Sequence, residues 1–135
     1  MPLKISLKPG ERVIIGGAVI TNGSAKGEFL VENKVPILRQ KDILSIKEAN
    51  TPCRRIYFVI QLMYIDEEQS VKHHQTYWQL VKDLLSVTPK VLSLIDQISE
   101  QLLNNRYYQA LKLAKKLIDY EEEVLNRVPE SIKSL

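Results

Sequence analysis

The period of the hydrophobic pattern changes near residue 50, and this change constrains the fold more than any other feature of the chain. Before it, apolar residues alternate with polar ones, as Leu3, Ile5 and Leu7 do, which is typical of a strand with one buried face. After it, apolar residues recur every three to four positions, as they do in amphipathic helices. Because strands are followed by helices and do not alternate with them, the sequence predicts an α+β fold.

Glycine and proline divide the first 49 residues into short strands. Gly16 and Gly17 separate two β-branched runs and suit a tight hairpin turn that needs positive φ. Pro36 cannot donate a hydrogen bond to a neighbouring strand, so the last run should lie at an edge or be irregular. We therefore expect a small N-terminal antiparallel β-meander of four or five strands within residues 1–49. The expected strands are residues 3–7, 12–15, 18–21, 28–32 and 35–39.

Residues 50–128 are predicted to form a C-terminal bundle of about four helices, and residues 129–135 a C-terminal tail. Thr51 and Pro52 provide an N-cap and the residue preferred at the first helical position. The helix that follows is apolar on every side from residue 56 to residue 65, so it is either central to the bundle or buried against another subunit. Its excess of apolar surface predicts that the protein forms a homodimer. Later helices are expected to be capped by Ser70 and by Thr88 with Pro89, and the last to begin at Tyr107 and end before Pro129.

The second of these helices carries a wide apolar and aromatic stripe. Its members recur at helical spacing, so they should share one side of the helix. They are Val71, His74, Tyr77, Trp78, Val81, Leu84 and Leu85.

The net charge of +3 is unevenly distributed. Residues 1–55 contain ten Lys or Arg against five Asp or Glu, whereas residues 56–135 contain nine against eleven. A basic half of this kind suggests an anionic partner such as nucleic acid. Phe29 is the only aromatic residue among the first 47, so this layer lacks the stacking platform of many RNA-binding modules. Recognition would then depend on phosphate contacts, on Arg or Lys at base edges and on RNA shape.

Arg54 and Arg55 fall in the first turn of a helix, where the macrodipole disfavours each cation by ~0.3 to 1 kcal/mol. A bound phosphate would compensate, because a helix N-terminus suits an anion and two guanidinium groups could clamp it. Alternatively, Glu48 pairs with one arginine while both side-chain stems cover apolar surface. We take Arg54 and Arg55 as the first candidates for RNA binding. The supporting candidates are Lys4, Lys8, Arg12, Arg39, Lys41 and Lys47.

No pattern of catalytic, metal-binding or cofactor-binding residues stands out. His73 and His74 are neighbours on a helix and point about 100° apart, so they cannot chelate one ion together. Cys53 has no His or Asn placed by spacing as a partner base. The sequence therefore predicts a protein that is not an enzyme and has no metal or cofactor. With one cysteine and no apolar run near the ~20 residues that cross a bilayer, we expect a cytoplasmic protein without membrane contact.

Three segments together resemble the FlbT family of flagellar biosynthesis repressors. They are LKPGERVIIGGAVITNG (residues 7–23), ILRQKDIL (37–44) and TPCRRIYFVIQLMYI (51–65). The resemblance implies a cytoplasmic, noncatalytic regulator that associates with the 5′ untranslated region of flagellin mRNA and promotes its degradation or blocks its translation. It also implies a second small flagellar protein, FlaF, as a partner.

A competing hypothesis is a protein-interaction module that never touches RNA. In this case the acidic helical bundle would present a groove to FlaF or to a flagellar export client, as a chaperone or adaptor does. The basic half would then pair with an acidic protein surface. The resemblance also leaves the sign of regulation open, because some members of the family act positively.

Overall fold

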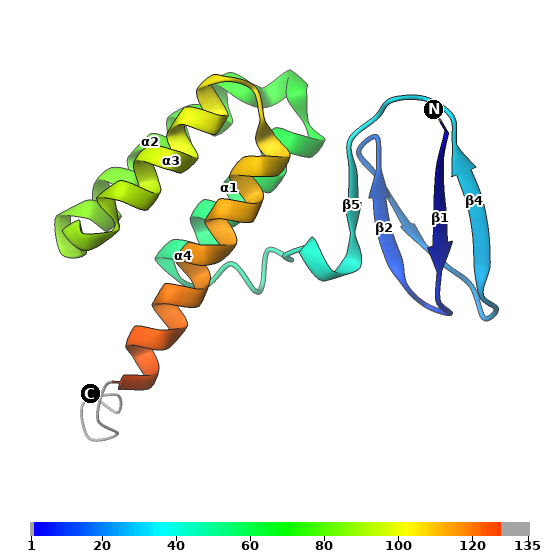
Figure 1. The fold of residues 1–135 in the computed structure, drawn as a ribbon, viewed down its shortest axis with the longest axis horizontal. Coiled ribbons are helices and arrows are strands. Elements are labelled where there is room, and N and C mark those ends of the chain that lie inside the picture. The colour runs from blue at the N-terminus through cyan, green and yellow to red at the C-terminus, as the bar shows by residue number, and fades with distance from the viewer. Residues whose placement is uncertain (1, 128–135) are drawn as a thin grey trace. The chain divides into compact units, whose positions relative to one another are not determined.

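The structure is a computed structural model, and it describes residues 2–127. The chain divides into two compact units, Met1–Ile43 and Leu44–Leu135. The first unit contains antiparallel strands and the second contains helices (Figure 1), which confirms the α+β fold class. Within the described residues, no helix combines the length and the apolar character needed to cross a membrane.

The strands of the first unit form two small antiparallel sheets. In one sheet β1 pairs with β4, and in the other β2 lies between β3 and β5. Of these pairings only β2 with β3 joins strands adjacent in sequence, so the strand order is not that of a simple meander. The strand bounds are β1 (Leu3–Leu7), β2 (Arg12–Ile15), β3 (Ala18–Thr21), β4 (Gly27–Val31) and β5 (Ile37–Arg39).

The packing of apolar faces explains this pairing. Ile5, Leu7 and Val13 form a fully buried cluster, and Phe29 and Ile37 pack against it. Strands from both sheets thus contribute their apolar sides to one core. Alternation along a strand determines which side is buried, but it does not determine which strand becomes the hydrogen-bonded neighbour.

Two local predictions for this unit are confirmed. Gly16 and Gly17 have φ values of +57° and +87°, the positive φ at both central residues that a type I′ hairpin turn needs. β5, which follows Pro36, is an edge strand of its sheet.

The second unit is built around its first helix. α1 contacts both α2 and α4, and α3 packs against α4. Ile56, Ile60 and Met63 on α1 are completely buried. The apolar character of this helix is therefore explained within one chain and does not require a partner subunit. The bounds are α1 (Pro52–Ile65), α2 (Ser70–Val87), α3 (Leu92–Leu103) and α4 (Tyr107–Arg127), with 3₁₀ turns η1 (Gln40–Asp42), η2 (Glu67–Gln69) and η3 (Pro89–Val91).

The predicted helix caps have mixed outcomes. The Thr51 side chain accepts a hydrogen bond from the backbone N–H of Arg54 at 3.2 Å, as expected for an N-cap. Ser70 is not a cap, because it is the first residue of α2 and Gln69 occupies the cap position. Thr88 makes no side-chain cap bond. Pro129 and the expected tail lie outside the described residues.

The stripe on α2 is only partly buried. Tyr77, Val81 and Leu84 are buried as expected, whereas Val71 and Trp78 are exposed. The stripe is thus wider than the surface that the neighbouring helices cover.

Candidate nucleic-acid interface

Cations gather at one end of the β unit. In an antiparallel arrangement the chain reverses at each turn, so the β1–β2 and β3–β4 connections lie at the same end, opposite the labelled N-terminus (Figure 1). The register pairs Val13 with Arg39, which places the end of β5 beside the start of β2. We call five exposed residues at this end the basic end: Lys8, Arg12, Lys26, Arg39 and Lys41.

Two amide side chains hold the segments of the basic end together. Asn22 Nδ2 donates to the carbonyl oxygens of Lys8 at 2.9 Å and Ala25 at 3.0 Å, which ties the end of β1 to the β3–β4 loop. Gln40 Oε1 accepts a hydrogen bond from the backbone N–H of Arg12 at 2.7 Å. The Gln40 bond joins the segment after β5 to the start of β2. The two amide side chains thus hold together the backbone segments that carry the cations.

Two carboxylates of the β unit have partners other than the side chains of the basic end. Glu11 accepts a hydrogen bond from the backbone N–H of Lys8 at 2.8 Å, and Glu28 forms an ion pair with Lys4 at 3.4 Å. No side chain of the basic end forms an ion pair with a described residue. All five cations can therefore bind an external anion without first losing an internal partner.

The residues expected from the sequence to bind RNA divide between the two units. Lys8, Arg12, Arg39 and Lys41 come together at the basic end, whereas Lys4 lies within β1 and pairs with Glu28. Lys47, Arg54 and Arg55 belong to the helical unit. Lys26 was not singled out from the sequence. The signal that could have found it is the alternation of turns, since the loop after the third strand returns to the same end as the loop after the first.

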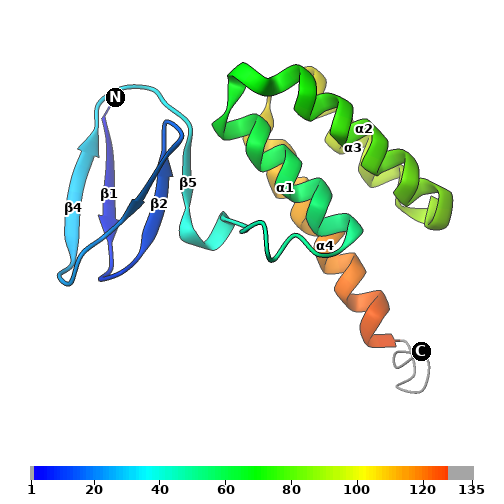
Figure 2. The same cartoon turned by 180° about the vertical axis from the view of Figure 1, so that it is seen from behind.

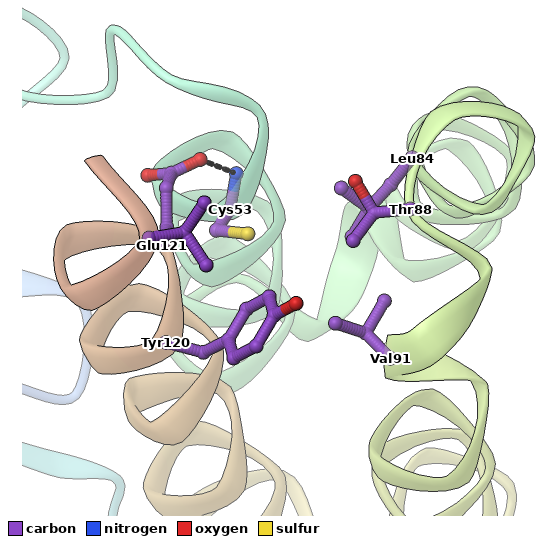
Figure 3. A pocket seen from close by; sticks show the side chains of 7 residues that line it. Cys53, Leu84, Thr88, Val91, Tyr120 and Glu121 are labelled. Carbon is purple, nitrogen blue, oxygen red and sulfur yellow. Dashed lines mark hydrogen bonds between the residues drawn. The ribbon is translucent and has the colours of Figure 1, made fainter. Parts of the chain in front are cut away.

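The N-terminus of α1 is completed by a carboxylate of α4. Glu121 accepts hydrogen bonds from the Thr51 hydroxyl and from the backbone N–H of Cys53, the latter at 3.2 Å (Figure 3). Its negative charge therefore lies where the helix macrodipole favours an anion. The sequence indicated that this terminus needs a compensating charge, and the structure supplies it from within the chain.

The two arginines of the first turn have different surroundings. Arg54 donates to Glu122 at 3.2 Å and to Asn50 at 3.0 Å, so a carboxylate of α4 pairs with its charge. The Arg55 side chain is exposed and has no partner among the described residues. Arg55 is thus the one of the two that is available to an external ligand.

Replacing Glu121 with alanine is expected to lower the free energy of unfolding by about 2 kcal/mol. The change leaves the Cys53 backbone N–H and the Thr51 hydroxyl without their acceptor and removes the anion from the helix N-terminus. Urea unfolding followed by circular dichroism measures the loss. Asp119→Ala, an exposed position on the same helix, is the control, and equal losses in both variants would contradict the role given to Glu121.

A small pocket lies beside Glu121. It holds about 120 Å³ and is lined mainly by apolar atoms (Figure 3). Burial, and secondarily the negative charge of Glu121, raises the pKa of the Cys53 thiol to about 12. A thiol held protonated is a poor nucleophile. The remaining lining residues are Leu84, Thr88, Val91, Tyr120 and Val124.

Within residues 2–127, no group of three or more His, Cys, Asp or Glu side chains is arranged to hold a metal ion.

Comparison with known proteins identifies the family of this chain. A family model described as "Flagellar protein FlbT" matches residues 3–125. The chain is 39% identical over 136 residues to "Flagellum biosynthesis repressor protein FlbT" of Caulobacter vibrioides, covering 99% of this chain and 96% of that protein.

Two further relatives carry the name "Probable flagellum biosynthesis repressor protein FlbT". The one from another Caulobacter species is 41% identical over 130 residues, covering 95% of this chain and 99% of the relative. The other, which carries the number 1 after its name, is from Bradyrhizobium diazoefficiens and is 44% identical over 125 residues, covering 92% of this chain and 85% of the relative. No solved structure matches the chain. These matches extend over both units, so the chain belongs to the FlbT family of flagellar proteins, a family of regulators whose named relatives are repressors of flagellum biosynthesis.

Proposed function

We propose that this protein represses flagellum biosynthesis by binding the 5′ untranslated region of flagellin mRNA, which blocks translation or promotes degradation of the message. The observation that carries the proposal is the basic end. Its five exposed cations form no ion pair with a carboxylate within residues 2–127. The names of the relatives support the repressor role. The RNA target is what the sequence resemblance implies.

The chemistry of the basic end suits the RNA backbone. Lysine and arginine side chains bind phosphate oxygens, and arginine can do so with two parallel hydrogen bonds. The register pairs Val13 with Arg39, so Arg12 and Arg39 lie at the same end of the three-stranded sheet but project from its opposite faces, and each can contact a different phosphate. Arg55, exposed at the start of α1, is a further candidate contact on the helical unit.

The salt dependence of binding tests this proposal. Five phosphate contacts on a single strand should make log affinity fall with log salt concentration with a slope of about −3.5. Fluorescence anisotropy of a labelled flagellin leader with purified protein, across a series of salt concentrations, measures the slope. A slope near zero, or no binding at low salt, would overturn the proposal and favour the adaptor hypothesis.

A further inference from the structure

The exposed part of the α2 stripe is a surface that the basic end does not explain. Val71, His74 and Trp78 are spaced by three and four residues and therefore share one face of the helix. The exposed fraction is 73% for Val71 and 44% for Trp78, the chain's single tryptophan. Figure 2 shows α2 in front of α3, where its length can be followed. A large aromatic ring is thus presented to solvent from a rigid helix.

Neighbouring rings hold this surface in place. Trp78 meets Tyr77 in a T-shaped contact with centroids 5.0 Å apart, and the buried Tyr77 hydroxyl is hydrogen-bonded to Ser99 at 2.8 Å. His74 meets Tyr107 of α4 in another T-shaped contact at 6.3 Å. The T-shaped contact with Tyr77 orients the indole and leaves 44% of Trp78 exposed for a ligand.

Unpaired cations flank the aromatic surface. Lys82 lies one turn beyond Trp78 on the same side of α2, and Arg106 immediately precedes Tyr107. Both are exposed and form no ion pair with a described residue. The adjacent Asp83 accepts a hydrogen bond from Gln79 at 3.1 Å. Flat rings beside free cations suit a ligand that carries both aromatic bases and phosphates.

We propose that this surface, formed by Val71, His74 and Trp78 with Lys82 and Arg106 at its margins, stacks unpaired bases of single-stranded RNA. The inference rests on the proposed function and deepens it. The basic end can bind phosphates, but Phe29, the one aromatic residue of the β unit, packs against the core. The α2 surface adds the exposed aromatic ring that the basic end lacks. Stacking on an aromatic side chain contributes about 1 to 3 kcal/mol per base.

The fluorescence of Trp78 tests the inference directly, because no other tryptophan contributes to the signal. Titration with a single-stranded flagellin leader fragment should quench this fluorescence in parallel with the anisotropy change of the labelled RNA. Trp78→Ala should weaken binding about tenfold and leave the salt slope unchanged, because no phosphate contact is removed. Trp78→Phe, which keeps a flat ring, should restore most of the affinity. Leu92→Ala is the control, since Leu92 is 50% exposed but lies on α3.

The possible outcomes separate this inference from the proposed function. If the labelled RNA binds but Trp78 fluorescence and the Trp78→Ala affinity do not change, the stacking surface is wrong and RNA binding by the basic end stands. If neither readout detects binding at low salt, the proposed function fails as well. Light scattering that shows a dimer abolished by Trp78→Ala would assign the surface to a second copy of the chain and overturn the inference. Inorganic polyphosphate should compete for the basic end without quenching Trp78.

Discussion

Replacement of Arg12, Arg39 and Lys41 by alanine is expected to weaken binding of the flagellin leader about 100-fold at low salt. The three residues lie at the same end of the three-stranded sheet, and none forms an ion pair with another residue within 2–127. Each lost phosphate contact should cost about 1 kcal/mol, and ~1.4 kcal/mol corresponds to a factor of ten in affinity. The salt slope should also become shallower by about 2.

The control for this variant removes three exposed lysines elsewhere, Lys34, Lys90 and Lys116, and changes the net charge by the same amount. It should lose much less affinity than the basic-end variant. Equal losses would mean that net charge, and not the arrangement at the basic end, determines binding. Circular dichroism of both variants verifies the fold. The hydrogen bond from residue 12 to Gln40 uses the backbone N–H and survives the substitution.

The Cys53 thiol is expected to react about 1,000-fold more slowly with a thiol reagent at pH 8 in the native protein than in the unfolded chain. Burial and the Glu121 charge raise its pKa from 9.0 to about 12, so the fraction of reactive thiolate falls about tenfold for each unit. Ellman's reagent, with and without urea, measures the ratio. Similar rates in both states would show that the thiol is accessible and ionisable in the folded protein.

The raised pKa of the Cys53 thiol also predicts that the folded protein loses stability at alkaline pH. A raised pKa means that the folded state favours the protonated thiol, so its stabilisation is complete below pH 9 and is lost as the pH rises towards 12. Burial likewise raises the pKa of Tyr77 from 10.0 to about 12, which acts in the same direction. Cys53→Ala should therefore flatten the decline of the free energy of unfolding above pH 9, as urea titrations at several pH values can measure.

Local signals in the sequence were sufficient for most of the secondary structure. The cap Thr51, the proline that follows it and the apolar run predicted the bounds of α1, and the two glycines predicted the turn between β2 and β3. Strand neighbours were not predictable, because alternation specifies a buried side and not a partner. The burial of the α2 stripe was predicted only in part, since Trp78 has the spacing of a core residue but remains 44% exposed.

The candidate site was likewise predictable from the sequence only in part. Composition and charge placed the cations in the first part of the chain and identified Arg54 and Arg55 as residues at an unfavourable helix end. Only the tertiary structure brought Lys8, Arg12, Lys26, Arg39 and Lys41 to one end of the β unit and placed Glu121 and Glu122 at the start of α1. The physical reason is range: turns, caps and hydrophobic periods act between residues a few positions apart. The partners of a charge are set by the packing of segments as many as 70 residues apart in the chain.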